Sequence, residues 1–199
     1  MIRTVVAVVR IVAQPLAVGI VAALVVRATL LQAYSIPSGS MSPTLEAGDH
    51  ILVTPMTRYL GGESPRRGDV VVFRNPEVGP GFFVKRVIAL PGEHVEIRDG
   101  NVRIDGRVLE EPWTGEATRG TLSDIVPAEH VFVLGDHRGD SIDSRVWGVL
   151  PSGRIVGRAR VIFWSSDAVS GSSAAAHSLG GEREATARTR WERILRPVR

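Results

Sequence analysis

The segment Gly81–Leu90, GFFVKRVIAL, decides the fold, because its β-branched and aromatic residues predict a β-strand. Side chains alternate between the two faces of a strand, so Lys85 shares a face with Phe83 and Val87, and Arg86 emerges on the opposite face. Lys85 therefore points alone into an apolar face. Arg86 cannot take its place there, although the two residues are adjacent in sequence.

Short β-branched runs separated by Gly, Pro and Asp continue on both sides of this segment. They predict further strands at His50–Thr54, Asp69–Arg74, His94–Arg98, Val102–Ile104, Glu129–Leu134 and Arg158–Trp164. Hairpin-turn signals at 99–101 and 105–106 predict a small meander over His94–Glu111. No long helical period interrupts these runs. The sequence therefore predicts a mostly β domain over 32–164, an antiparallel sheet that forms a partly closed, barrel-like structure.

The N-terminal segment Ile11–Val26 carries no charge. If Arg10 and Arg27 extend toward the interfaces, the span reaches about 20 residues, which is enough for a bilayer core. We predict a transmembrane helix within a first region, residues 1–31. The basic residues favour a cytoplasmic N-terminus and an extracytoplasmic domain. A buried core helix and a cleavable signal peptide are the alternatives. The absence of a clean small-x-small cleavage site soon after the apolar run argues against a signal peptide.

The C-terminal region, residues 165–199, differs in composition from the domain. Ser, Gly and Ala over 165–181 predict a flexible linker, and the basic segment 182–199 predicts disorder with nascent helix or contact with anionic lipid. The whole net charge of +3 comes from residues 182–199, so the pI of 10.1 does not indicate a nucleic-acid-binding face. The chain has no cysteine, which excludes disulfides, cysteine nucleophiles and cysteine-ligated metals.

A single lysine, Lys85, stands among 24 basic residues, and all the others are arginines. Arginine stays protonated at physiological pH, whereas burial can lower the pKa of a lysine by several units from about 10.4. A neutral amine beside a serine can accept the hydroxyl proton, and so activate a nucleophile without histidine or aspartate. Lys85 is therefore a candidate general base.

Two loop segments supply possible partners for this lysine. In Ile36–Leu45, IPSGSMSPTL, two prolines and a glycine stiffen and expose Ser38 and Ser40; an ordinary loop with capping serines is the alternative. In Leu134–Pro151, LGDHRGDSIDSRVWGVLP, Asp, Arg, Ser and Gly follow an apolar strand. This segment could also form a calcium loop or a solvated turn. The two arginines among its carboxylates favour ion pairs over calcium.

Four ordered motifs give the chain a resemblance to bacterial type I signal peptidases, the membrane-anchored Ser–Lys proteases that remove signal peptides from exported preproteins. The resemblance covers about residues 36–164, and it implies that the family's β-ribbon lies at about residues 93–134. The motifs are PSGSMxPTL at Pro37–Leu45, GDxVVF at Gly68–Phe73, KRxxxLPG at Lys85–Gly92 and GDxRxxSxDSRxWG at Gly135–Gly148. The lysine found by counting occupies the general-base position of this family.

The resemblance implies a role for each matching residue. Ser40 would be the nucleophile, and Lys85 would accept its proton and later return it to the leaving amine. Ser38 would join the Ser40 backbone N–H in the oxyanion hole, where removal of one donor typically costs about 3 kcal/mol of transition-state stabilisation. These assignments come from the matched motif positions.

The same resemblance implies residues that hold the lysine in position. Ser141 would hydrogen-bond the amine, and Asp143 with Arg145 would form a supporting ion pair. The sequence departs from the family at His137, where asparagine is usual, and at Gly139, where another polar residue is frequent. The nucleophile, the base and the lysine-orienting serine all match despite these departures.

The resemblance also implies the substrate and partners. A signal peptide would lie extended along strand edges near 35–37 and 82–84, and shallow pockets would select small residues at the first and third positions before the cut. The candidate pocket residues are Ile36, Pro37, Met41, Leu45, Phe83 and Val84. The expected partners are preprotein signal peptides, the phospholipid membrane and the export translocon, with no nucleic acid, metal or cofactor. A Ser–Lys processing peptidase dedicated to pilins or a conjugation system, and a catalytically inactive membrane-tethered scaffold, are the alternatives.

Overall fold

The computed structural model describes residues 31–56, 64–74, 79–167 and 188–198, together with 13, 16, 18 and 19. The chain divides into two compact units, Met1–Gln32 and Ala33–Arg199. The predicted membrane segment lies mostly outside the described residues, and the four residues described within it are helical. In the described part of the chain, no helix combines the length and the apolar character needed to cross a membrane.

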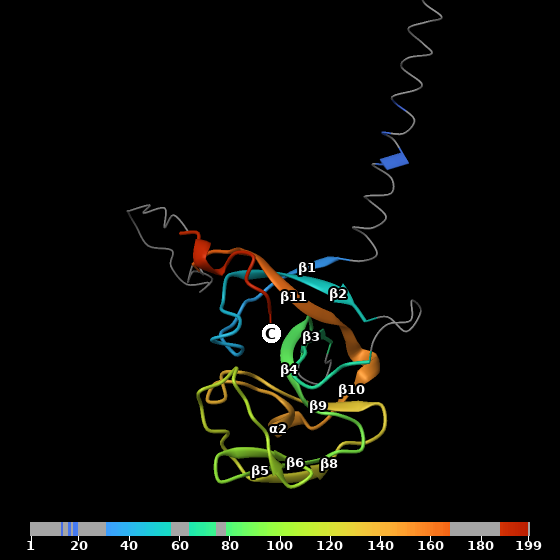
Figure 1. Ribbon diagram of the computed structural model, residues 1–199, viewed down its shortest axis with the longest axis vertical. Helices are drawn as coiled ribbons and strands as arrows, with labels where there is room; N and C mark the ends of the chain where they lie inside the picture. The colour runs from blue at the N-terminus through green and yellow to red at the C-terminus, as the bar shows by residue number, and fades with distance from the viewer. Residues whose placement is uncertain are drawn as a thin grey trace, which may run out of the picture. The chain divides into compact units, whose positions relative to one another are not determined.

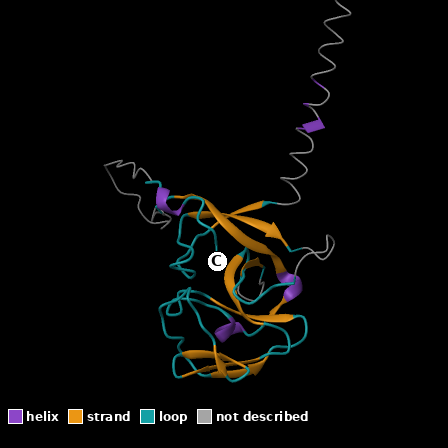
Figure 2. Ribbon diagram, in the orientation of Figure 1, coloured by secondary structure: helices purple, strands orange, loops and turns teal. Residues whose placement is uncertain are grey.

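The unit Ala33–Arg199 consists mainly of antiparallel strands, which confirms the prediction of a mostly β domain (Figure 1, Figure 2). Its strands are β1 (Gln32–Ser35), β2 (Asp49–Pro55), β3 (Val70–Phe73), β4 (Phe83–Ala89), β5 (His94–Arg98), β6 (Asn101–Ile104), β7 (Arg107–Val108), β8 (Leu122–Ile125), β9 (His130–Leu134), β10 (Leu150–Pro151) and β11 (Ile155–Ser165). Its described helical pieces are the one-turn helix α2 (Ser144–Trp147) and the 3₁₀ turns η2 (Ser152–Arg154) and η3 (Trp191–Arg193).

The larger sheet has seven strands in the order β1-β2-β11-β3-β4-β9-β10. Strand β11 comes last in the chain but lies between β2 and β3, and it pairs antiparallel with both. Register shifts along β11 accompany the curl of the sheet into a half-barrel (Figure 1). At Gly157 a Cβ would lie 2.4 Å from the Thr54 carbonyl oxygen, so the close approach of β11 to β2 requires glycine there.

The smaller sheet has four strands in the order β7-β6-β5-β8 and forms the predicted ribbon. Strands β5 and β6 pair from Val95–Ile104 to Arg98–Asn101, so the predicted hairpin is present. Asp99 and Asp105 have φ values of 54° and 51°, and each is followed by a glycine with positive φ. Asp-Gly pairs tolerate this left-handed backbone, which explains why these turns were readable from sequence.

The larger sheet is buried on both faces around its centre. In β3, Val70 and Val72 belong to one core cluster, with residues of β2 and β11, whereas Val71 and Phe73 belong to another. A strand buried on both faces reads as a continuous apolar run, as VVVF does here. Strand β4 lies next to β3 and is also buried on both faces over much of its length, so a polar side chain there is withdrawn from water.

Most of the predicted flexible linker lies outside the described residues, because the structure describes nothing between 167 and 188. The described part of the basic tail is folded against the domain. Residues 188–198 lie against β11, with bridges between Ser166 and Thr189 and between Val161 and Pro197. The described tail contains a 3₁₀ turn, η3, where nascent helix was predicted. Periodicity could not reveal this arrangement, because it depends on ion pairs with residues more than a hundred positions earlier.

Candidate active site

Ser40 lies on the loop between β1 and β2, which is anchored by apolar side chains. The loop is closed at its base by a hydrogen bond of 2.9 Å from the Gly48 N–H to the Ile36 carbonyl. Met41 and Leu45 are 1% and 0% exposed and belong to the core cluster of the larger sheet. Burial of these two side chains fixes the loop and leaves Ser40 partly exposed at its surface.

Lys85 lies on β4, and its side chain is withdrawn from solvent at 5% exposure. Its Nζ atom is 2.7 Å from Ser40 Oγ, within hydrogen-bond distance. Burial lowers the pKa of Lys85 from its ordinary value of 10.5 to about 8, although the carboxylates of Asp143 and Asp136 act in the opposite direction. The neutral amine is therefore well populated at mildly alkaline pH, and it is placed to accept the Ser40 proton.

The loop that follows β9 carries the predicted ion pair. Asp143 is fully buried, and Arg145 Nε and Nη2 each donate to one of its carboxylate oxygens at 2.8 Å. The Gly135 N–H donates to the same carboxylate at 3.0 Å. Burial would raise the pKa of Asp143, but these hydrogen bonds outweigh it and lower the pKa. The carboxylate therefore stays charged and ties the two ends of the loop together.

Gly135 brings this loop into direct contact with the backbone of Ser40. A Cβ at Gly135 would collide with Ser141 Oγ and would lie 2.5 Å from the Ser40 carbonyl oxygen. The same carbonyl accepts a hydrogen bond of 3.2 Å from the His137 N–H. The Ser141 hydroxyl is buried and forms no hydrogen bond with Lys85 in this structure. It lies close enough to Asp143 to contribute to the lowered pKa of that carboxyl.

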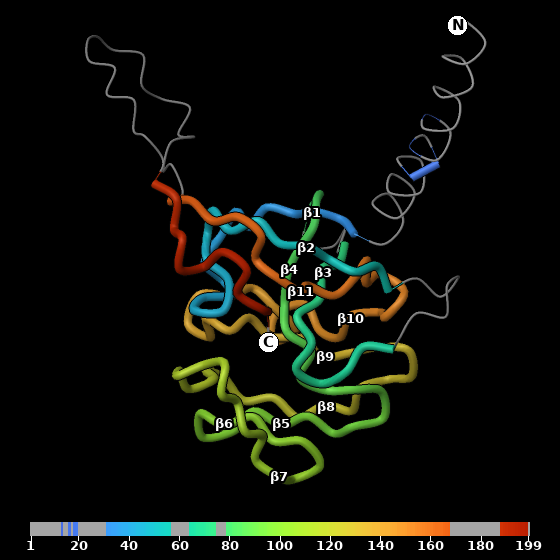
Figure 3. The backbone as a smooth tube through the Cα atoms, turned by 45° about the horizontal axis from the view of Figure 1, so that its top comes forward, coloured from blue at the N-terminus to red at the C-terminus, as the bar shows by residue number. Residues whose placement is uncertain are grey.

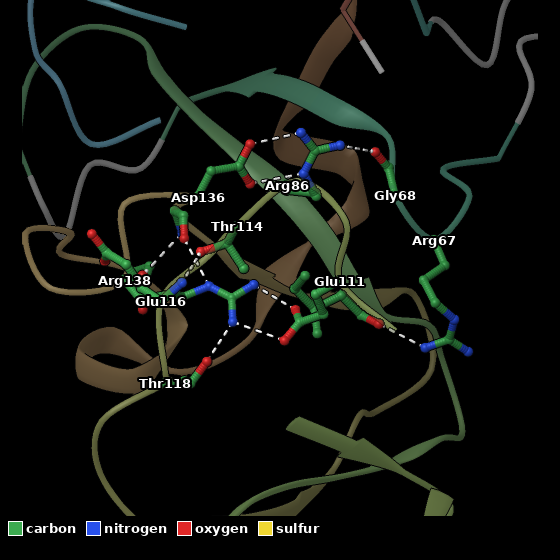
Figure 4. Close-up of polar contacts among 12 residues, drawn as sticks. Arg67, Gly68, Arg86, Glu111, Thr114, Glu116, Thr118, Asp136 and Arg138 are labelled. Atoms are coloured by element: carbon green, nitrogen blue, oxygen red, sulfur yellow. Dashed lines mark hydrogen bonds and ion pairs between the residues drawn. The ribbon is translucent and has the colours of Figure 1, made fainter. Parts of the chain in front are cut away.

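A buried ion pair that the sequence analysis did not foresee fixes the same loop. Arg86 and Asp136 are both fully buried, and Arg86 Nε and Nη2 donate to the Asp136 oxygens at 2.8 and 2.6 Å (Figure 4). Arg86 also donates to the Gly68 carbonyl at 2.7 Å, and its guanidinium lies 4.6 Å from the ring centre of Trp113. Alternation placed Arg86 opposite Lys85 but could not identify its partner.

A second arginine, Arg138, links the loop that follows β9 to the segment between β7 and β8 of the smaller sheet. Arg138 Nη1 and Nη2 donate to the two carboxylate oxygens of Glu111 at 3.0 and 2.5 Å, and Arg138 Nε donates to the Gly135 carbonyl at 3.0 Å (Figure 4). The sequence favoured ion pairs between the arginines of this loop and its own carboxylates. Arg145 forms such a pair, whereas Arg138 finds its partner on a distant segment.

A cleft of about 400 Å³ opens beside Ser40 and Lys85. Ser38 lies on its wall and is exposed. Leu45, a predicted pocket residue, is not on the wall, because its side chain is fully buried in the core. The other five predicted pocket residues all line the cleft: Ile36, Pro37, Met41, Phe83 and Val84.

Residues 8–164 match the family model described as "Signal peptidase, peptidase S26". The chain belongs to the signal peptidase family. Signal peptidase I of Leptolyngbya laminosa is 41% identical over 154 residues, which cover 73% of this chain and 74% of that protein. The probable signal peptidase I-1 of Synechocystis is 41% identical, with coverage of 75% and 79%. Signal peptidase I T of Bacillus subtilis is 33% identical, with coverage of 74% and 81%.

Membership of the signal peptidase family confirms the resemblance drawn from the four motifs. The two departures from the family pattern lie beside a single residue, Glu116. His137 Nε2 is 3.4 Å from a Glu116 carboxylate oxygen, and the Gly139 N–H donates to the other at 2.9 Å. Both departures therefore lie where the loop after β9 meets the segment that carries Glu116, and the contact between Ser40 and Lys85 involves neither the His137 side chain nor Gly139.

Proposed function

We propose that the chain is a membrane-anchored Ser–Lys endopeptidase that cleaves N-terminal signal peptides from exported preproteins after small-x-small sites. The 2.7 Å contact between a buried lysine and a partly exposed serine, at the wall of a cleft, carries this proposal. The uncharged segment Ile11–Val26 would be the single membrane anchor, with the N-terminus in the cytoplasm and the domain outside. Ser40 follows that segment closely enough to act near the membrane surface.

In the proposed reaction, Ser40 Oγ attacks the scissile carbonyl while its proton passes to the Lys85 amine. The oxyanion of the tetrahedral intermediate would accept hydrogen bonds from the Ser40 N–H and the Ser38 hydroxyl. Lys85 then gives the proton to the leaving amine, which releases the mature protein and leaves the signal peptide esterified to Ser40. Water then attacks this ester and gives a proton to Lys85, which passes it to Ser40 Oγ as the ester bond breaks. The signal peptide leaves with a free C-terminal carboxyl group, and the serine hydroxyl is restored.

The remaining site residues would support this proton transfer. The buried Ser141 hydroxyl would hydrogen-bond the Lys85 amine as it changes charge. The ion pair of Asp143 with Arg145 would hold the loop that carries Ser141. A lysine with four rotatable bonds needs such support, since misplacement of the base by about 1 Å can cost on the order of a hundredfold in rate.

Cleavage of a defined preprotein tests the proposed function. The full-length chain in detergent should cut a preprotein once, after alanine at the first and third positions before the cut. Leucine or phenylalanine at the first position should reduce kcat/KM by about 10- to 100-fold. These side chains would overfill the pocket, and overpacking costs about 1–3 kcal/mol of free energy. Mass spectrometry of the products would identify the bond that breaks.

The second position before the cut provides the matched control. An extended peptide points this side chain away from the pockets, so the same bulky substitution there should change kcat/KM by no more than about twofold. Absence of cleavage, or equal loss at both positions, would contradict the proposal. A purified Ser40→Ala chain that still cleaves would show that a contaminating protease is responsible.

The pH dependence of cleavage should follow the ionisation of Lys85. Because burial lowers the pKa of Lys85 to about 8, kcat/KM should rise about tenfold per pH unit below that value and level off above it. An arginine or an ordinary surface lysine could not give this profile. An acid limb that continues to rise to about pH 10 would show that Lys85 is not desolvated in the working enzyme.

A further inference from the structure

Residues 188–198, which we call the C-terminal strap, run beside β11 and reach the loop that carries Ser40 (Figure 3). Backbone hydrogen bonds attach the strap to β11: the Arg190 N–H donates to Ser165 O at 2.9 Å, and the Leu195 N–H donates to Ile162 O at 2.7 Å. Val198 packs against the core cluster that also contains Met41 and Leu45. The strap is therefore an integral part of the folded domain.

Arg193 inserts from the strap into the base of the Ser40 loop. Its side chain is 7% exposed, and its Nη2 donates to the Asp49 carboxylate at 2.6 Å and to the Thr44 carbonyl at 3.1 Å. Its Nε lies 3.1 and 3.2 Å from the two Asp49 oxygens, and its Nη1 donates to Glu46 at 3.1 Å. One guanidinium thus ties together three residues on the C-terminal side of the loop.

Arg190 binds the same stretch. Its Nη1 donates to Glu46 at 2.6 Å, and its Nη2 donates to the Ala47 carbonyl at 2.7 Å. Glu46 uses one carboxylate oxygen for Arg190 and the other for Arg193. Two arginines and two carboxylates therefore form one network, with bidentate geometry that lysine could not reproduce.

Asp49 depends on this network because its carboxylate is fully buried. Burial alone would raise the pKa of Asp49, but hydrogen bonds from Arg193, the Glu46 N–H and the Ser165 hydroxyl outweigh it and lower the pKa. Without Arg193 the carboxylate would keep its burial and lose its main counter-charge. The loop would have to move to hydrate or protonate Asp49, because an unpaired buried charge is strongly unfavourable.

The loop is also held near Ser40, by contacts with β4 and with the loop that follows β9. The Ser40 carbonyl accepts from the His137 N–H at 3.2 Å, and the Thr44 hydroxyl accepts from Arg86 at 3.2 Å. Arg193 fixes the Thr44 backbone, which lies four residues after Ser40. Movement of Thr44 would therefore be passed to Ser40 through one turn of chain.

We propose that the C-terminal strap positions the nucleophile, and that Arg193 is the positioning residue that fixes the Ser40 loop from outside the catalytic motifs. This inference rests on the proposed role of Ser40. The C-terminal strap would then support catalysis, although its composition predicts only a basic extension. No contact between the strap and Lys85 is needed, because the strap acts on the serine side of the pair.

The test compares Arg193→Gln with Arg196→Gln in the full-length chain in detergent. Arg196 lies on the same strap, but its side chain makes no hydrogen bond or ion pair with the described residues, so it is the matched control. Arg193→Gln should lower kcat by about 10- to 100-fold, with KM within about twofold, because displacement of the nucleophile impairs the chemical step. Arg193→Lys should restore only part of the rate, since it supplies charge without the bidentate fork.

Two readouts separate positioning from a merely structural role. The rate is expressed per folded molecule, well below the melting temperature, because simple destabilisation leaves the rate of the folded fraction unchanged. The midpoint of the pH profile should stay near 8, because the environment of Lys85 is intact. If Arg193→Gln fails to fold, Arg190→Gln replaces it, as that side chain is more exposed, at 17%.

Labelling by a fluorophosphonate keeps this test separate from the proposed function. Such a reagent reports the reactivity of Ser40 without a peptide substrate, so slower labelling of Arg193→Gln would support the strap even if the wild-type chain cut no preprotein. Equal rates per folded molecule for wild type and Arg193→Gln would overturn the inference. Equal losses in Arg193→Gln and Arg196→Gln would overturn it as well.

Discussion

Substitution of Lys85 by methionine or arginine should abolish cleavage, with kcat lower by about four to six orders of magnitude. Methionine fills the same apolar position but carries no basic nitrogen. Arginine retains the charge but stays protonated at any working pH, so it cannot accept the Ser40 proton. Loss of a residue from a catalytic unit that acts together has effects of this size. Single-turnover cleavage of a preprotein by each purified variant would measure the loss.

Ser40→Ala and the double variant Ser40→Ala/Lys85→Met provide the matched controls. If the serine and the lysine act as one unit, as proposed, the double variant should be no slower than either single variant. Fluorophosphonate labelling of Ser40 should disappear in Lys85→Met while the fold is retained. Rapid cleavage by Lys85→Met would remove the lysine from the mechanism, whatever its distance from Ser40.

Lys85→Met should also change how stability depends on pH. The pKa of Lys85 is about 8 in the folded chain and near 10.5 when solvated, so the unfolded state binds more protons between these values. The stability of the wild-type chain therefore gains a contribution as the pH rises through this window. The advantage of Lys85→Met over wild type should shrink by roughly 2 kcal/mol between about pH 7 and about pH 10. Denaturant unfolding at the two pH values would measure this change.

Gly135→Ala should reduce kcat by about two to three orders of magnitude. The added methyl group would occupy space that Ser141 and the Ser40 carbonyl already fill, at a distance of 2.5 Å from the carbonyl oxygen. Either the loop after β9 or the backbone of Ser40 must move, and a displacement of about 1 Å at a reacting group costs on the order of a hundredfold in rate. Steady-state kinetics with a signal-peptide substrate would measure this loss.

Gly139→Ala is the control for this substitution, because it adds the same methyl group to the same loop. Its Cβ would lie 3.6 Å from the nearest Glu116 oxygen, an ordinary van der Waals contact. Activity should therefore stay within about twofold of wild type. If Gly135→Ala were as active as Gly139→Ala, the contact among Gly135, Ser141 and Ser40 would have no catalytic importance.

Much of the fold was predictable because its signals are local. Alternation in 81–90 located β4 and separated Lys85 from Arg86, and Asp-Gly pairs located the turns of the ribbon. The long-range ion pairs were not predictable in the same way. The partners of Arg86 and Arg138 lie 50 and 27 residues away, so no local period or spacing connects them.

The described part of the tail shows this limit most clearly. Its composition resembles that of a solvated basic segment, and its arginines could equally have faced water or lipid. Arg193 instead pairs with a carboxylate 144 residues earlier, because the fold places Asp49 beside the end of β11. The sequence shows that the tail is basic, but it does not show that Arg193 pairs with Asp49.

The amino-acid sequence by itself determined the chemistry available to this protein: one lysine within an apolar strand, serines on a stiff loop and a mostly β chain, all of which follow from residue type and local period. The tertiary structure decided three further points. The lysine and the serine meet at 2.7 Å, no side chain fits at position 135, and the C-terminal strap binds the Ser40 loop. The reason is physical, since burial and hydrogen bonding between distant segments depend on where the completed fold places them.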